Sequence, residues 1–214
     1  MSIIKPKLSG VFFQRADLEG IIREALQEEA DLKNFRFTDS FLEGVEVHTI
    51  EFQNCVFDSC QFPACSFKRI FFVDVVFEKC DLSNLDLGAC IFHRVEFKNC
   101  KAVGANFTEA TLRNVLFEGC NCKYINLSGA TLKQSIFASS DLSGGSMQEG
   151  KLKKVSFADC SLLKMELLHT PLGGIDFRTC ALDGILVSGE ELKGAIVTPY
   201  QACQLARLLG LIVK

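Results

Sequence analysis

The stretch "CDLSNLDLGACIFHRVEFKNC" (Cys80–Cys100) repeats an apolar residue at every fifth position. These residues are Leu82, Leu87, Phe92 and Phe97. An α-helix repeats about every 3.6 residues and a strand alternates every second residue, so neither produces a period of five. The spacing therefore predicts a different path of the backbone.

The same period runs through most of the 214-residue chain. Every residue whose number ends in 2 or 7, from Leu32 to Val197, is apolar: this is a set of 34 positions, and it contains 14 of the 19 phenylalanines. Two positions earlier most residues are small, and nine of the eleven cysteines lie there. We call the apolar position the centre of a pentad and the earlier small position its slot.

The pentad predicts one short strand followed by one corner. In an extended chain the slot and the centre point inward and the residue between them points outward. The two outward residues that follow break this alternation, and the Gly, Asn and Asp common among them suit a turn. Phenylalanine recurs at every twentieth residue, so four pentads make one turn of a four-sided solenoid. The recurrent residues are Phe37, Phe57, Phe77, Phe97, Phe117, Phe137, Phe157 and Phe177.

Stacked turns of this kind should pair as parallel strands. At about 4.8 Å per strand, about eight turns give an all-β rod roughly 40 Å long and about 20 Å wide. Because large side chains fill the interior, no internal pocket is expected. Function should then lie on the outer surface and at the two ends.

Composition excludes several classes of protein. The formal net charge of −3 disfavours a simple binder of nucleic acid or of anionic membranes. No apolar run approaches the roughly 18 residues that would cross a bilayer. The start, "MSIIKPKLSG", is too short and too polar for a signal peptide, so we expect a cytoplasmic protein with reduced thiols.

The two ends depart from the repeat, which divides the chain into residues 1–31, 32–197 and 198–214. In the first part, Phe13 and Leu18 fit pentads one residue out of frame, and "EGIIREALQEEA" (residues 19–30) predicts a short helix that interrupts or covers the first coil. This helix should cap the open end of the core, and binding of a partner is the alternative. In the last part, Thr198 and Pro199 predict a helix start, and Gly210 predicts its end. The final "LIVK" predicts a short strand. This apolar end should cap the last coil, join two chains, or do both.

No constellation of residues predicts catalysis, a cofactor or a metal, so we expect a binding protein and not an enzyme. The cysteines recur at intervals of five and lack paired ligand spacing, which favours packing; a redox or metal role is the alternative. Some outward residues are apolar, and they are either ordinary strand formers or a contact surface. They are Val56, Phe71, Val76, Ile91, Leu116 and Ile136.

The pattern A/C-D/N-L/F-x-x resembles that of pentapeptide repeat proteins, which implies a right-handed quadrilateral β-helix. Three stretches, "CKAVGANFTEATL", "SSDLSGG" and "PYQACQLARLLGLIVK", are similar to segments of the Qnr quinolone-resistance family, of the type without outward loops. This resemblance implies a DNA-mimicking homodimer that binds DNA gyrase and topoisomerase IV, inhibits them or protects them from quinolones, and does not bind nucleic acid directly. It implies a dimer interface formed by Tyr200, Leu205, Leu208, Leu211, Ile212 and Val213.

Charge limits how literally DNA could be copied. Duplex DNA carries one negative charge per ~1.7 Å, or about 24 over the length of the rod. Residues 31–198 hold 21 acidic and 17 basic residues, a net charge of −4. Mimicry would therefore need local acidic stripes, for which Glu46, Asp81, Asp86 and Asp141 are the candidates. The alternative is a pentapeptide-repeat scaffold for an unrelated protein partner.

Overall fold

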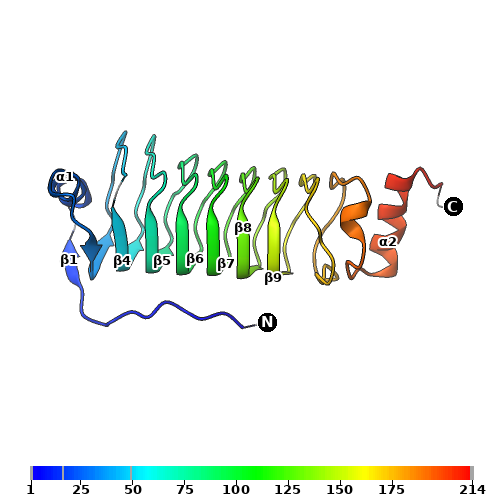
Figure 1. Ribbon diagram of the computed structural model, residues 1–214, viewed down its shortest axis with the longest axis horizontal. Helices are drawn as coiled ribbons and strands as arrows, with labels where there is room; N and C mark the ends of the chain where they lie inside the picture. The colour runs from blue at the N-terminus through cyan, green and yellow to red at the C-terminus, as the bar shows by residue number, and fades with distance from the viewer. Residues whose placement is uncertain (1, 16, 49, 213–214) are drawn as a thin grey trace.

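The computed structural model describes residues 2–15, 17–48 and 50–212, and shows a rod of stacked coils with a helix at each end (Figure 1). The strands are β1 (Phe13–Arg15), β2 (Leu32–Lys33), β3 (Phe35–Thr38), β4 (Glu51–Asp58), β5 (Phe71–Glu78), β6 (Ile91–Lys98), β7 (Thr111–Glu118), β8 (Thr131–Ala138) and β9 (Lys151–Ala158). The helices are α1 (Leu18–Glu28), α2 (Pro199–Ala206) and the 3-10 turns η1 (Glu190–Leu192) and η2 (Arg207–Leu209).

Parallel pairing at intervals of twenty residues builds the rod. Strands β4 to β9 follow one another in a single parallel sheet, and Phe57 pairs with Phe77 as Phe77 pairs with Phe97. Isolated parallel bridges on the other sides keep the same interval, for example Asp81 with Lys101. The predicted fold class, an all-β solenoid of pentapeptide repeats, is confirmed.

The centre residues form the core. The phenylalanines at intervals of twenty stack ring on ring, with centroids 4.5 Å apart between Phe97 and Phe117 and 4.8 Å apart between Phe117 and Phe137. The ladder loosens at its C-terminal end, where the rings of Phe157 and Phe177 are 5.7 Å apart. Identical rings stack because Phe recurs every twenty residues and one full coil also contains twenty residues.

The slot accepts a small side chain that can donate a hydrogen bond. The thiol of Cys80 donates to the carbonyl of Phe57 in the preceding coil, with 3.4 Å between sulfur and oxygen. The hydroxyl of Ser140 makes the same bond to Phe117, also at 3.4 Å. Ser therefore replaces Cys without a change in the pattern. Ten cysteines are free and buried, and Cys203 is free and exposed.

The corner is a left-handed residue at the same place in nearly every described pentad, with Thr179 as an exception. Among the described residues, all 23 non-glycine residues with positive φ have numbers ending in 4 or 9. They include alanine, lysine and glutamate, which cost about 1–2 kcal/mol each in this conformation. The stacked core and the hydrogen-bonded ladders therefore stabilise a backbone conformation that these residues rarely adopt on their own.

Helix α1 covers the N-terminal end of the core (Figure 1). Asp17 caps it by accepting a hydrogen bond from the N–H of Gly20 at 2.8 Å, and the buried face includes Leu18, Ile22 and Ala25. Leu18 is thus the first residue of a helix and not the centre of a pentad. Phe13 is 59% exposed in β1 and pairs with Phe35, an offset of 22. Placing Phe13 and Leu18 at pentad centres was wrong because α1 is inserted into this first coil.

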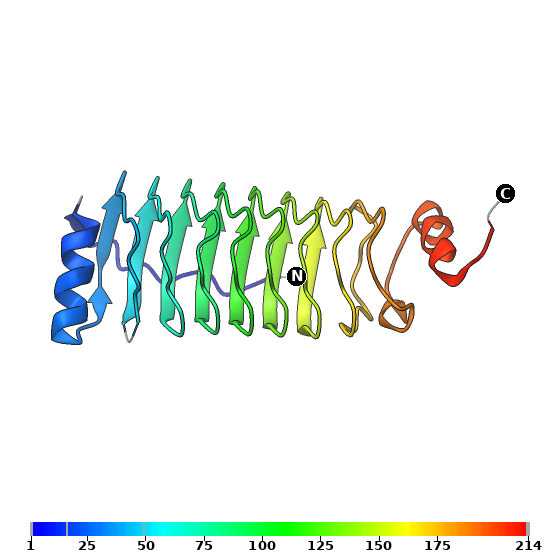
Figure 2. The ribbon, with the colours of Figure 1, turned by 90° about the horizontal axis from the view of Figure 1, so that it is seen from above.

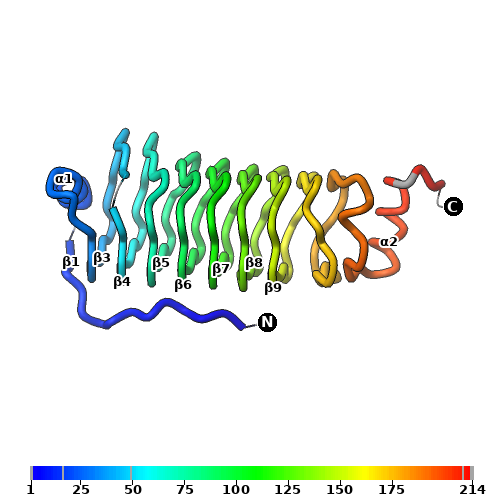
Figure 3. Tube along the Cα trace, viewed as in Figure 1, coloured from blue at the N-terminus to red at the C-terminus, as the bar shows by residue number. Residues whose placement is uncertain are grey.

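The first residues do not form a coil. Residues 2–12, which we call the strap, run back along the outside of the rod from β1 past β4, β5 and β6 as far as β7 (Figures 2 and 3). The strap contains no strand or helix. Its backbone N–H groups donate hydrogen bonds to side chains of the rod, and the acceptors are Asn54, Asp74 and Asn114.

Candidate interaction surfaces

The four acidic candidates lie in two columns on neighbouring sides of the rod. Asp81 and Asp141 belong to one column of parallel bridges, three coils apart. Glu46 and Asp86 belong to the next column, two coils apart. The structure therefore brings them together as two separated pairs and not as one continuous stripe.

Three of these carboxylates help to build the corners. Asp81, Asp86 and Asp141 each accept a hydrogen bond from the backbone N–H two residues later, at 3.0–3.1 Å. Asn106 and Asn126 do the same in neighbouring coils. This local bond explains why Asp and Asn alternate at this place of the repeat. These acidic residues therefore stabilise the corner that follows them, and their charge is not needed for that role.

Lysines from adjacent coils neutralise the same three carboxylates. Lys101 lies 3.0 Å from Asp81, Lys68 lies 2.8 Å from Asp86, and Lys123 lies 3.4 Å from Asp141. The partners are separated by 18 or 20 residues in the sequence, so the coil register creates the pairs. Glu46 is exposed and contributes to the raised pKa of the Lys68 amine, for which the main cause is Asp86.

Burial and hydrogen bonding act in opposite directions on these carboxyl groups. Partial burial favours the neutral acid at Asp81, but hydrogen bonds from Ser83 and Lys101 outweigh it and lower its pKa. The pKa of Asp86 is lowered against burial by Lys68 and the N–H of Gly88. Both groups are therefore ionised and paired at neutral pH. The surface thus presents alternating charges, which differ from the uniform charge of a DNA backbone.

The C-terminal helix docks on the open edge of the last coil. Thr198 and Gln201 form a reciprocal capping box at the start of α2, as Thr198 and Pro199 predicted. The side chain of Gln201 is buried, and its amide donates to the carbonyls of Phe177 and Cys180, both at 2.8 Å. These carbonyls would otherwise be part of an unpaired sheet edge.

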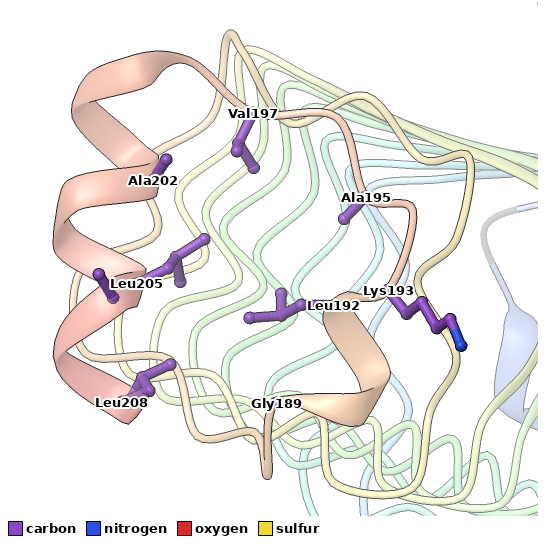
Figure 4. A pocket seen from close by; sticks show the side chains of 9 residues that line it. Gly189, Leu192, Lys193, Ala195, Val197, Ala202, Leu205 and Leu208 are labelled. Atoms are coloured by element: carbon purple, nitrogen blue, oxygen red, sulfur yellow. The ribbon is translucent and has the colours of Figure 1, made fainter. Parts of the chain in front are cut away.

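An apolar hollow of about 330 Å³ remains between α2 and the end of the core (Figure 4). Leu205 and Leu208 point into it from the helical side, and Leu192 and Val197 face them from the last coil (Figure 4). Although Leu192 and Val197 are pentad centres, they are only half-buried. The helix therefore covers the core incompletely, and the rod ends in a partly open apolar surface.

The predicted interface residues have different positions in this end. Leu205 is half-buried and Leu208 is 43% exposed. Tyr200, Leu211 and Ile212 are exposed by 74%, 56% and 87% and do not line the hollow. Val213 lies outside the described residues. The prediction omitted Leu192 and Val197, although they end the column of centres and the sequence alone marks them.

The predicted C-terminal strand is absent from the described residues, since Leu211 and Ile212 are in neither a strand nor a helix. A strand needs a hydrogen-bonding partner. Helix α2 already occupies the edge of the last coil, which removes the nearest such partner.

Within residues 2–15, 17–48 and 50–212, no group of three or more His, Cys, Asp or Glu side chains has the arrangement of a metal site. No helix in this described part of the chain has both the length and the apolar character needed to span a bilayer. Burial raises the pKa of the Cys55 thiol to about 11 and that of Cys90 to about 12. These two thiols are therefore protonated at neutral pH.

The repeated pentad, its left-handed corner and the register of twenty define the fold as a solenoid of pentapeptide repeats. Residues 70–147 match the family described as pentapeptide repeat region, and the structure extends the same repeat on both sides. No curated protein matches the sequence.

Two solved structures resemble this chain, and the one with a TM-score of 0.50 shares its fold. One is a trypsin-treated variant of QnrB1, a plasmid-mediated fluoroquinolone resistance protein; it is 22% identical, the match covers 87% of this chain and 91% of that one, and the TM-score is 0.50. Another is a pentapeptide repeat protein from the thylakoid lumen of Arabidopsis thaliana. It is 16% identical over 44% of this chain and 63% of its own, with a TM-score of 0.32.

Proposed function

We propose that this protein binds a type II topoisomerase, DNA gyrase or topoisomerase IV, and thereby inhibits the enzyme or protects it from quinolones. The observation that carries the proposal is the continuous rod, which resembles QnrB1 over 87% of the chain and continues into a C-terminal helix with an incomplete apolar cover. QnrB1 is a fluoroquinolone resistance protein. Binding at the outer surface is the mode that a filled rod permits.

Shape supports this proposal better than charge does. A four-sided coil has about 10 Å of backbone per side, and its outward side chains extend the rod to about 20 Å, which is about the width of a DNA duplex. The ion pairs of Asp81, Asp86 and Asp141 with lysines reduce the net field of the two acidic columns. Basic residues of a partner would compete with these surface lysines for the carboxylates, and such exposed pairs are weak enough to exchange.

The pentad supplies substitutions that test the acidic columns without disturbing the fold. Asn occupies equivalent positions at Asn106, Asn121 and Asn126. Replacement of Asp by Asn therefore removes the charge and keeps the corner hydrogen bond. The test variant carries Glu46→Gln, Asp81→Asn, Asp86→Asn and Asp141→Asn. A matched control removes four acids elsewhere, by Asp58→Asn, Glu78→Gln, Glu118→Gln and Asp159→Asn.

The assay is DNA supercoiling by gyrase with and without ciprofloxacin. We expect the wild-type protein to inhibit supercoiling or to restore it in the presence of the drug. The test variant should need about tenfold more protein, equivalent to about 1.4 kcal/mol of lost binding, and the control should match the wild type. If the wild-type protein neither inhibits nor rescues, the proposal fails and the scaffold for another protein is favoured. Equal effects in both variants would exclude the acidic columns as the contact surface.

We also propose that the apolar C-terminal end joins two copies of the chain. The hollow beside Leu205 and Leu208 and the exposure of Leu211 and Ile212 leave an apolar surface that a second copy would cover. Leu208→Asp should convert a dimer into a monomer in light scattering. Phe71→Asp, at a residue of similar exposure (44%) in β5, is the control and should leave the mass unchanged. A monomeric wild-type protein, or a dimeric Leu208→Asp variant, contradicts this arrangement.

A further inference from the structure

One side of the rod carries a group of cations in its C-terminal half. This side is formed by the first four residues of β7, β8 and β9, which include five cations and no acid. The strands align them, so that Arg113 is the neighbour of Lys133, and Lys133 is the neighbour of Lys153. Lys151 lies in the next outward column and Lys154 at the corner that follows. We call these five residues the basic face: Arg113, Lys133, Lys151, Lys153 and Lys154.

The fold does not need these cations. None of the five forms an ion pair with another residue in the described part of the chain, whereas the lysines beside the acidic columns are paired with carboxylates. Like charges directly opposite each other on neighbouring strands are destabilising. Gln53 and Val73 occupy the same column in earlier coils, so the position accepts uncharged residues. Stability alone therefore does not explain the basic face.

Positive charge also predominates at the next residue of the column. His93 is the strand neighbour of Arg113. Burial and the charges of Arg94, Arg113 and Lys7 lower the pKa of His93, and the opposing charge of Asp74 does not cancel them. The basic face is therefore continuous with a region of positive potential toward the middle of the rod.

A hollow of about 350 Å³ lies within the basic face, between β9 and the coil that follows. Its apolar lining includes Leu132, Leu152 and Pro171. The lysines that line it are Lys133, Lys151 and Lys153. The hollow thus combines an apolar surface with three cations.

A proline accounts for the position of this hollow. At equivalent places the N–H of Thr131 donates to the carbonyl of Ala110 and the N–H of Lys151 to that of Ala130, both at 2.9 Å. Pro171 follows Lys151 by twenty residues and has no N–H to donate. Residues 171–174 form no strand, and β9 is the last strand of the described sheet (Figure 1). Leu152 is consequently half-buried, although it is a pentad centre.

We propose that the basic face binds an acidic segment of a partner protein, with carboxylates against the lysines and an apolar side chain in the hollow. Charge complementarity selects an acidic partner. The apolar hollow favours a protein segment over nucleic acid, because a phosphate backbone supplies charge without an apolar side chain. Phe71 and Ile91, which are 44% and 39% exposed on the same side, extend the apolar contact area.

This site is separate from the acidic columns. The acidic columns lie on the two sides that are joined by isolated bridges, whereas the basic face belongs to the strands. The proposal therefore does not depend on topoisomerase binding, and failure of one leaves the other standing.

The repeat supplies a test variant and a matched control. The test variant carries Lys133→Gln, Lys151→Thr and Lys153→Gln, which copy Gln53 and Thr131 from the same two columns. The control variant removes three exposed cations outside the basic face, by Arg69→Gln, Lys79→Gln and Lys164→Gln. These three residues lie at left-handed corners, where Gln134 shows that glutamine is accepted. Both variants have the same net charge.

The probe is a fluorescent peptide of Glu residues around a central Leu, and its binding to the full chain is followed by fluorescence anisotropy. The test variant should bind about tenfold more weakly than the wild type, which corresponds to the loss of three exposed ion pairs, and the control should match the wild type. A peptide with Gln in place of every Glu should not bind, and one with Ser in place of Leu should bind more weakly.

Three results would overturn the proposal. They are absence of peptide binding to the wild-type chain, equal weakening in the two variants, and equal binding of the Glu and Gln peptides. Duplex DNA and phosphatidylserine vesicles are tested in parallel. If either binds the wild-type chain and the peptide does not, the basic face recognises phosphate groups and an acidic protein segment is excluded.

A second measurement needs no variant. Acetylation of lysine side chains in the wild-type chain is followed by mass spectrometry with and without the Glu peptide. The peptide should slow acetylation of Lys133, Lys151 and Lys153 and leave that of Lys79 and Lys164 unchanged. Equal slowing at all five lysines would exclude the basic face as the binding site.

Discussion

Replacement of Phe117 by alanine removes a ring from the middle of the stacked column and tests whether the column stabilises the rod. Phe117 is fully buried, and its ring contacts those of Phe97 at 4.5 Å, Phe137 at 4.8 Å and Phe107 at 5.8 Å. Deleting a buried Phe side chain costs about 3–5 kcal/mol. Each ring pair contributes about 0.5–1.5 kcal/mol beyond area burial. With three ring neighbours, Phe117→Ala should lie at the upper end, near 5 kcal/mol.

Phe177 is the matched control because it is 2% exposed but has one ring neighbour, Phe157 at 5.7 Å. Phe177→Ala should therefore cost about 3 kcal/mol, and the difference of about 2 kcal/mol corresponds to two ring pairs. Because the chain has no tryptophan, guanidinium unfolding is followed by circular dichroism. The m-values must agree, since coils at an end of a solenoid can unfold separately. A smaller cost for Phe117→Ala than for Phe177→Ala would refute stabilisation by the stacked rings.

Three further changes test the slot, the C-terminal coil and the thiols. Gly145→Ala should lower the free energy of unfolding by about 1–3 kcal/mol, because its Cβ would lie 2.9 Å from the carbonyl oxygen of Ile125. Gly88→Ala is the control, because the atom nearest to its Cβ would be a side-chain oxygen at 3.2 Å. Burial opposes ionisation of Glu191, but hydrogen bonds from the N–H of His169 and from Ser188 lower its pKa to about 2. The stabilisation by ionised Glu191 is therefore complete above the unfolded pKa near 4.5 and is lost as the pH falls through 2. Glu191→Gln should lower the free energy of unfolding at pH 7, and in acid it should unfold with the same free energy as the wild type. Unfolding measured at the two pH values checks this. A thiol reagent should modify one cysteine in the native protein, and Cys203→Ser should abolish that reaction; several fast thiols would contradict the buried columns.

The fold was predictable because one physical rule repeats. The centres from Leu32 to Val197 stay in frame without interruption, and no single residue decides the outcome. The start of α2 was predictable for a different reason, since Thr198 and Pro199 are local signals that need no tertiary contact. Both kinds of signal can be read from short windows of sequence.

The missed features depend on residues far apart in the chain. The lysine partner of Asp86 is 18 residues away, and it becomes visible only when the sequence is written in rows of twenty. The strap bonds span 45 to 110 residues, and residues 2–12 have no period of their own. The sequence predicted helix α1 and the return of the frame at Leu32, but it gave no sign that Phe13 pairs with Phe35 at an offset of 22.

The fixed left-handed corner restricts how such a chain can change in length. Loss or gain of one amino acid between residues 32 and 197 would shift every later residue by one place in its pentad, so that inward and outward side chains would no longer match their positions and new residues would fall at the left-handed corner. Only a whole turn of twenty residues can be duplicated or deleted while all downstream columns remain aligned. Growth by complete turns would lengthen the rod in steps of about 4.8 Å and preserve its cross-section. The length of the rod and the side chains on its surface can therefore change independently of each other during evolution.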